Sequence, residues 1–245
     1  MFGIRTQRSK GGKEEAEKPF WISFSDLMTA LMVLFLVSMA VALMAVTQKI
    51  ADSDKKGQSR EETIDSCMTD IKSLTKDKDF EEIAIRDHAI DFGKPVLFEH
   101  GQHTLSPQQE YLIRSFVPKV LEVARRRSCD QWLKRVVVEG FASERGGTYL
   151  ENLNLSYLRS QRVLCVLLNR QAQNSLSLED RAQVRALFHP GGSSFNTASA
   201  SEERMRRVEL TLEFRDLDAK KEPTREIPDE YAVCPNDLYV RRLPE

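Results

Sequence analysis

Residues 20–46 read FWISFSDLMTALMVLFLVSMAVALMAV, and this apolar run decides the organisation of the whole chain. A lipid hydrocarbon core about 30 Å thick is crossed by roughly 20 residues of α-helix, so the run predicts a transmembrane helix. The alternative is a cleaved signal peptide, because Ala40-Val41-Ala42 has the small residues of a cleavage site. The long preceding segment, which contains three glutamates, and the apolar continuation to Val46 favour a retained anchor.

The charges on either side of the run predict its orientation. Residues 1–19 carry five lysines and arginines, whereas cations and acids alternate after the run in KIADSDKKGQSREE. Positive charge gathers on the cytoplasmic side of membrane proteins. We therefore expect residues 1–19 to be a cytoplasmic tail and the large C-terminal part to be periplasmic or extracellular.

Asp26 is the one charged residue of the run, and it lies about 9 Å inside it at 1.5 Å per residue. An ionised aspartate near the centre of a membrane helix costs about 2.5 to 3.5 kcal/mol. The neutral acid is therefore favoured, which suits a group that takes up and releases protons. Ser23 and Thr29 lie three residues to either side and form a polar stripe with it. The alternatives are an acid tolerated near the headgroups or a structural pair with a partner subunit. Because a lone helix cannot enclose an ion path, ion transfer would require partner helices.

The overall composition argues against several classes of function. The net charge of -1 and the pI near 6.5, with only short basic clusters, give no surface for nucleic acid. The cysteines form no CxxC pair and the histidines lack metal-ligand spacing, so no metal or other cofactor is expected. Nucleophile-elbow and Walker patterns are absent from the sequence, and we expect a non-enzymatic protein.

Residues 47–79 are polar and charged, which predicts a linker. Within it Ile64, Cys67, Ile71 and Leu74 follow the 3-4-3 spacing of a short coiled coil, which is also the spacing of an amphipathic helix lying on its own domain. In a coiled coil Cys67 would face its copy, and an interchain disulfide would follow. The linker is also a candidate plug of an ion channel. The pairing of the four cysteines stays open among three connectivities.

Residues 80–220 alternate short strands with helices, which indicates a two-layer α/β sandwich. The chain as a whole is thus predicted to be α+β, with a single transmembrane helix, a linker helix and one α/β domain. Residues 221–245 are proline-containing and are expected to pack on the domain as a tail, where Cys234 could pin them. The expected elements are strands at 95–98, 135–140 and 207–214 and helices at 106–127 and 152–169.

The stretch GFASERGGTYLENLNLSYLRSQRVLCVL, residues 140–167, resembles the peptidoglycan-binding signature of OmpA-like domains, and RMRRVELTLEF resembles their closing strand. The resemblance implies that Arg159 binds a carboxylate of the peptide stem together with an acid. That acid is replaced here, so Ser143 or Glu144 would take its place. The resemblance assigns peptidoglycan binding to Ser143, Glu144, Asn152, Leu155, Ser156, Arg159 and Arg207.

The stretch FWISFSDLMTALMVLFLVSM resembles the membrane span of MotB-like stator subunits. Within this stretch, the sequence W-I-S-F-S-D-L-M-T-A-L-M resembles the MotB-like subunits of Zorya anti-phage systems more closely than flagellar MotB. The resemblance implies an inner-membrane homodimer within a ring of a MotA-like partner, ZorA, anchored to peptidoglycan, with Asp26 carrying protons or, alternatively, sodium ions. A flagellar-type stator and a passive membrane-to-wall tether are the alternatives.

Overall fold

The structure is a computed structural model, and it describes residues 14–143, 147–193, 203–221, 227–231 and 234. The side chains of 14–20, 22–23, 203–204 and 231 are outside this description. The chain divides into two compact units, residues 1–57 and 58–245. Glu144 lies outside the described residues.

The N-terminal unit is helical. Helix α1 (Glu14–Leu74) contains the apolar run, and it is the one helix in the described part that is long and apolar enough to cross a membrane. Large apolar side chains of the run are exposed, as a lipid-facing helix requires. Its hydroxyl groups bond back to the helix: Ser38 Oγ donates to the Phe35 carbonyl at 2.8 Å, and Thr47 Oγ1 to the Leu43 carbonyl at 2.9 Å. The expected membrane helix is therefore present.

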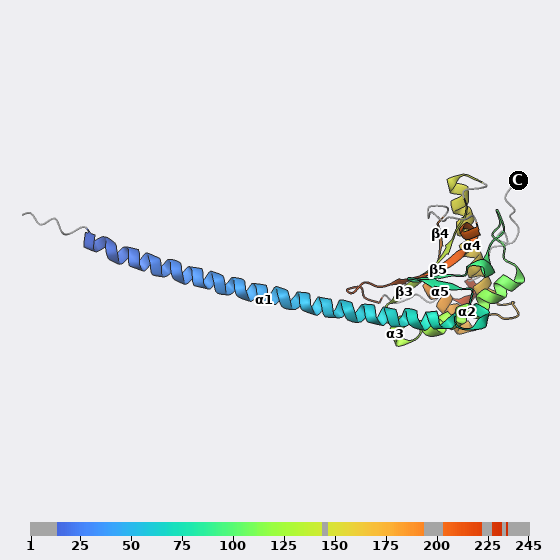
Figure 1. Ribbon diagram of the computed structural model, residues 1–245, viewed down its shortest axis with the longest axis horizontal. Helices are drawn as coiled ribbons and strands as arrows, with labels where there is room; N and C mark the ends of the chain where they lie inside the picture. Colours follow the sequence, from blue (N-terminus) through green and yellow to red (C-terminus); the bar gives the residue numbers. More distant parts are fainter. Residues whose placement is uncertain (1–13, 144–146, 194–202, 222–226, 232–233, 235–245) are drawn as a thin grey trace, which may run out of the picture. The chain divides into compact units, whose positions relative to one another are not determined.

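The second unit is a mixed α/β domain built on a five-stranded sheet of order β1-β2-β5-β3-β4. Only the β3–β4 pair is parallel within the described strands. Figure 1 labels the principal elements. The strands are β1 (Ala84–Arg86), β2 (Ala89–Asp91), β3 (Leu133–Gly140), β4 (Phe188–Gly192) and β5 (Val208–Phe214). The helices are α2 (Pro107–Ala124), α3 (Arg127–Asp130), α4 (Tyr149–Leu168) and α5 (Leu178–Leu187), with 3-10 turns η1 (Lys78–Phe80), η2 (Lys94–Val96), η3 (Glu203–Arg206) and η4 (Asp229–Tyr231).

Alternating side chains of the two central strands form the buried face of the sheet. Val136 pairs with Leu212 and Val138 with Leu210, and all four are at most 2% exposed. Period-two alternation of β-branched and aliphatic residues produces such a face. Helix α2 covers it with a stripe of apolar residues in one core with the strands, Ile113, Phe116, Val117 and Val120. The α+β class and the layering of helices on a sheet agree with the expectation from sequence.

Residues 58–74 of α1 belong to the domain, which therefore begins at Gln58 rather than near residue 80. Ile64, Cys67 and Ile71 are at most 5% exposed and share the core of the sheet. The spacing thus describes an amphipathic helix packed on its own domain. Cys67 is bonded to Cys129 of α3 within the chain, which corrects the interchain disulfide. Figure 1 shows α2 and α3 beside the end of α1.

The strand expected at 95–98 is not formed. Pro95 lacks an N–H group, and the Val96 N–H instead donates to the Gly93 carbonyl at 3.3 Å, which closes the turn η2. Val96 and Phe98 are nevertheless buried, so the apolar residues at 95–98 indicated a buried segment and not a strand of the sheet. The other expected strands and helices agree with β3, β5, α2 and α4 to within a few residues at their ends.

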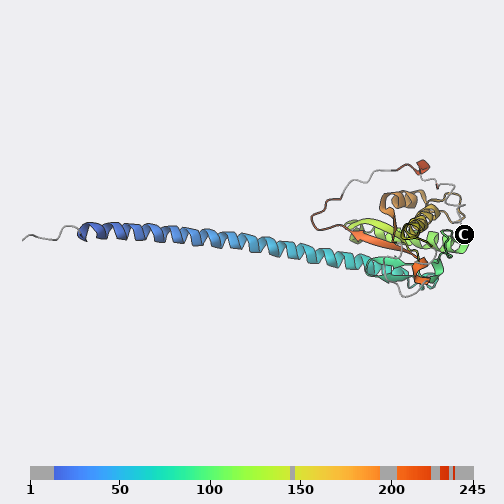
Figure 2. The same ribbon diagram turned by 90° about the horizontal axis from the view of Figure 1, so that it is seen from above.

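The C-terminal segment is attached to the domain at two described points. Cys234 is bonded to Cys165 in the last turns of α4, and η4 lies next to α5. Figure 2 shows η4 beside these helices. Cys234 is thus bonded to the domain, and the packing of residues 221–245 as a whole stays a prediction.

Candidate functional site

The candidate wall-binding site is organised by the start of α4. Thr148 caps the helix in a capping box with Glu151, which satisfies two of the free N–H groups of the first turn. Asn152 donates its side-chain amide to the Gly147 carbonyl at 3.1 Å. This fixes the loop that enters the helix, so Asn152 shapes the site rather than projecting into solvent, and it is 4% exposed.

Gly140 explains how closely α4 approaches β3. A Cβ atom at this position would lie 2.0 Å from the Ser156 carbonyl oxygen and 3.0 Å from the Arg159 Cβ. On the neighbouring strand, a Cβ atom at Gly192 would lie 2.6 Å from the Ser156 hydroxyl. Two glycines on adjacent strands therefore admit the helix, and a side chain at either would push α4 away from the sheet.

Arg159 is the centre of the site and is 1% exposed. Its guanidinium donates to the carbonyls of Gln102 at 3.0 Å and Glu99 at 3.2 Å, and also to the carbonyl of Phe141. Its Cζ lies 5.0 Å from the centre of the Phe98 ring. The arginine thus holds together the 99–102 loop, the end of β3 and the turn at Phe98.

Among the described residues, no carboxylate pairs with the positive charge of Arg159. Burial, followed by repulsion from Arg206, lowers the pKa of Arg159 to about 9, which still leaves it charged at neutral pH. Arg206 itself donates to the Phe98 carbonyl at 3.2 Å. Backbone carbonyls offer partial charges only, so the local charge balance is positive and favours an anion.

The remaining predicted wall-binding residues divide into two groups. Ser143 is buried two residues beyond Phe141, whose carbonyl accepts from Arg159. The side chains of Leu155 and Ser156 are also buried, and the Ser156 hydroxyl donates to the Leu153 carbonyl at 2.7 Å. Arg207 pairs with Glu209 at 2.6 Å and lies 4.2 Å from the Phe141 ring centre, so its charge is balanced within the sheet. Ser143 and Arg159 are thus both buried, and the wall-binding role of these residues stays a prediction.

The candidate ion-carrying residue lies in the other unit. Asp26 is in α1 and exposed, with Thr29 one turn further on. The Thr29 hydroxyl donates to the Asp26 carbonyl at 2.9 Å and to the Ser25 carbonyl at 3.0 Å, so its proton is engaged by the backbone. Ser23 belongs to the same helix, and its side chain lies outside the described residues.

A further charged cluster was not predicted from the sequence. Arg170, Arg181 and Arg185 all pair with Asp229 of η4. The only sequence signal was the i, i+4 spacing of two arginines in α5, and the acid lies 44 residues or more away along the chain.

Comparisons with known proteins bear on both units. Residues 4–53 match the family model described as membrane MotB of the proton-channel complex MotA/MotB. A putative MotB-like protein from Desulfovibrio vulgaris aligns with 64% of this chain and 96% of its own at 19% identity and a TM-score of 0.43. The OmpA-like domain of FopA1 from Francisella tularensis aligns with 55% of this chain and 82% of its own at 21% identity and a TM-score of 0.35.

The relationship extends over nearly the full length in one curated protein. The Zorya protein ZorB of Escherichia coli O139:H28 is 38% identical over 229 residues, which is 92% of this chain and 91% of that protein. An identity of this size over both units includes the membrane helix as well as the α/β domain. The chain therefore belongs to the ZorB family.

Proposed function

We propose that the chain is the ion-carrying, wall-anchored subunit of an inner-membrane rotary motor in anti-phage defence. The observation that carries the proposal is a membrane-length apolar run with one charged residue, Asp26, inside a segment that matches membrane MotB of a proton-channel complex. An acid within a membrane segment is by default a functional group, because its insertion costs about 2.5 to 3.5 kcal/mol.

The ion path needs partners. Asp26 is exposed on a single helix, so a homodimer of this chain within a ring of a MotA-like subunit, ZorA, would enclose it. A carboxyl group that takes up and releases a proton suits H⁺ as the transported ion, with Na⁺ as the alternative. The Thr29 hydroxyl oxygen lies on the same side of the helix and is a candidate acceptor beside the carboxyl group.

The anchor is proposed to be the site around Arg159. A buried cation held only by carbonyls favours a carboxylate ligand, and the peptide stems of peptidoglycan carry carboxylates. Ser143 would supply a hydroxyl where related domains place an acid. The cationic residues of 1–19 favour a cytoplasmic N-terminus, which would place this domain in the periplasm.

The motor is tested by phage plaquing on cells that carry the complete defence operon. Asp26→Asn keeps the size of the side chain and removes the ionisable group, so we expect protection to be lost while the complex still assembles. Asp52→Asn is the matched control, because Asp52 lies in the same helix beyond the apolar run. Unchanged protection by Asp26→Asn at equal membrane abundance would leave a passive wall tether as the function.

The anchor is tested separately by retention of the full chain on purified cell-wall sacculi. Ser143→Asp restores the acid at the position where the motif of related domains has one, and we expect tighter retention. Asp130→Asn changes one carboxylate in an exposed ion pair elsewhere and is the control. Retention that is equal for both variants and the parent would argue against wall binding at this site.

A further inference from the structure

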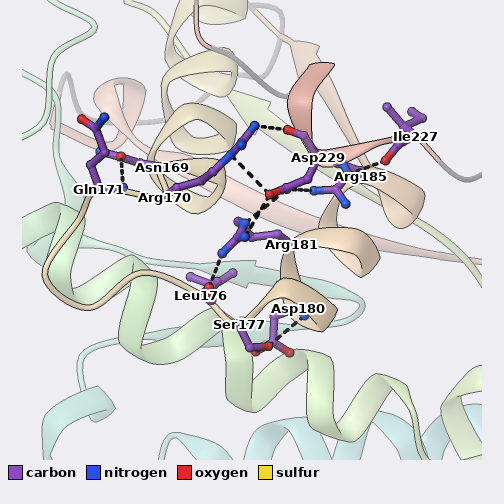
Figure 3. Close-up of polar contacts among 10 residues, drawn as sticks. All are labelled: Asn169, Arg170, Gln171, Leu176, Ser177, Asp180, Arg181, Arg185, Ile227 and Asp229. Atoms are coloured by element: carbon purple, nitrogen blue, oxygen red, sulfur yellow. Dashed lines mark hydrogen bonds and ion pairs between the residues drawn. The ribbon is translucent and has the colours of Figure 1, made fainter.

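Three arginines converge on one carboxylate at the end of α4 (Figure 3). Arg181 contacts both Asp229 oxygens, at 3.2 Å and 2.9 Å, and Arg170 Nε lies 3.3 Å from Oδ2. Arg185 donates to Oδ1, and its Nε donates to the Ile227 carbonyl at 2.8 Å. The Asp229 carbonyl accepts from Arg170. Arg170 comes from the loop just after α4, and Arg181 and Arg185 come from helix α5, which packs against α4.

The charges of this cluster are unequal. Three guanidinium groups face one carboxylate, and Asp229 is the one acid that pairs with them within the described residues. The side chains of Arg181 and Arg185 are 12% and 8% exposed, so water screens their charges only in part. A planar guanidinium matches a carboxylate in geometry, and several together make a carboxylate-binding site.

The described apolar side chains just before Asp229 are exposed. Ile227 is 46% exposed and Pro228 is also exposed. The segment is held by the arginine contacts and, further along the chain, by the Cys165–Cys234 disulfide. Its position therefore depends on charge and on a covalent tether, and an anion that satisfies the same arginines would compete with it.

We propose that Arg170, Arg181 and Arg185 form a second carboxylate-binding site, which the chain's own C-terminal segment closes by inserting Asp229. The ligand is a peptide carboxylate. The tethered segment is an internal competitor, since linkage gives it an effective concentration on the order of millimolar. External binding is weakened by the fraction of molecules in which the segment is closed. Residues 227–231 thus act as a strap, and they set the concentration of ligand that is needed to occupy the arginine site.

The proposal is tested on the full chain in detergent with a labelled peptide, Ile-Pro-Asp-Glu-Tyr, whose termini are blocked. Asp229→Asn weakens the internal competitor and leaves the three arginines, so we expect it to bind the peptide at least tenfold more tightly than the parent. The same peptide with Asn in place of Asp is the negative ligand. When Asp229→Asn is combined with Arg170→Gln, the increase in peptide affinity over the parent should be at least fivefold smaller. Arg170 is 44% exposed, so its replacement spares the fold.

The outcomes separate the alternatives. Equal binding by the parent and Asp229→Asn, with both chains folded by circular dichroism, would overturn the proposal and leave the cluster as a fixed structural pin. A gain that persists with Arg170→Gln, or with the Asn peptide, would overturn it as well. A blocked wall stem tripeptide is then added as a competitor: displacement identifies the ligand as a wall peptide, and lack of displacement identifies it as an acidic protein segment. None of these results depends on Asp26 or on plaquing.

Discussion

The domain contains two arginine sites on or beside α4, and the two differ in what balances the arginine charge. Arg159, in the middle of the helix, is 1% exposed and donates to three backbone carbonyls. Arg170, just after the helix, shares a half-buried carboxylate with Arg181 and Arg185. Arg159 is held by the partial charges of carbonyl groups, whereas the other three arginines surround the ionised carboxylate of Asp229.

The difference shows that a buried arginine can serve either to stabilise the fold or to bind an anion. At Arg159 the fold itself depends on the guanidinium, because three carbonyls would lose their donor without it. At Asp229 the fold depends less on the contacts, because the described residues just before it, Ile227 and Pro228, are exposed. Substitutions should therefore affect stability strongly at the first site and affect ligand access mainly at the second.

Arg159→Met should have the largest effect. It removes the donor for three carbonyls, and breaking a buried charged hydrogen-bond set costs about 3 to 5 kcal/mol. We expect a loss of this size in the free energy of unfolding, measured by urea denaturation of the full chain in detergent. Arg159→Lys keeps the charge and part of the bonding, and should lose less. A change below about 1 kcal/mol for Arg159→Met would show that the carbonyls are satisfied in another way.

Gly140→Ala should come next. The added Cβ would lie 2.0 Å from the Ser156 carbonyl oxygen, so α4 must move away from β3. Overpacking of this kind costs about 1 to 3 kcal/mol, and the shift should also weaken retention on sacculi. Gly57→Ala is the control, since a Cβ there meets nothing within 4 Å and alanine favours a helix. Equal stability of the two variants would contradict the close approach.

Asp229→Asn should be milder for stability. The carboxylate side chain is 19% exposed, and charged hydrogen bonds to it contribute about 1.5 to 3 kcal/mol before screening. We expect a loss of about 1 to 2 kcal/mol in thermal unfolding of the domain. Asp130→Asn breaks an exposed pair with Lys221 and should change stability by less than about 0.5 kcal/mol. A loss at Asp229 as large as that at Arg159 would remove the contrast between the two sites.

The pH dependence of the strap should be the smallest effect near neutrality. The hydrogen bond from Arg181, with the charges of Arg181, Arg170 and Arg185, lowers the pKa of Asp229 below its usual value of 3.8. The ionised Asp229 carboxylate therefore contributes its full share of stability above pH 3.8, the usual pKa. This stability is lost as the pH falls through the lower pKa that Asp229 has in the folded protein. Hydrogen exchange of residues 227–231 should be unchanged from pH 8 to pH 5, after correction for the intrinsic rate. Opening at pH 5 would show that the carboxylate is not held by the arginines.

Parts of this architecture could be predicted from the sequence because they depend on local pattern. The membrane helix follows from composition, and β3, β5, α2 and α4 follow from periodicity. Strands β1 and β2 have three residues each, which is too short for a period, and β4 contains Pro190 and two glycines, as an edge strand can. Helix α5 has only one fully buried residue, Val184, so its sequence shows no clear apolar stripe.

The candidate sites divide in the same way. Arg159 and Asn152 were found through an ordered motif, but sequence alone did not show that the arginine is buried among carbonyls. The Cys67–Cys129 and Cys165–Cys234 pairs, and the acid of the arginine cluster, join positions far apart in the chain. Only the folded backbone brings such positions together.

The Cys67–Cys129 disulfide sets the route by which tension enters the domain. The bond closes a loop across 62 positions of sequence, and that loop includes β1, β2 and α2. A pull applied to residue 58 would pass from Cys67 through the sulfur atoms to α3 and directly into β3, which starts three residues after α3 ends. The loop of residues 68–128 is then mechanically bypassed. The carbonyls of Glu99 and Gln102, which hold Arg159, would therefore keep their positions while the chain carries load.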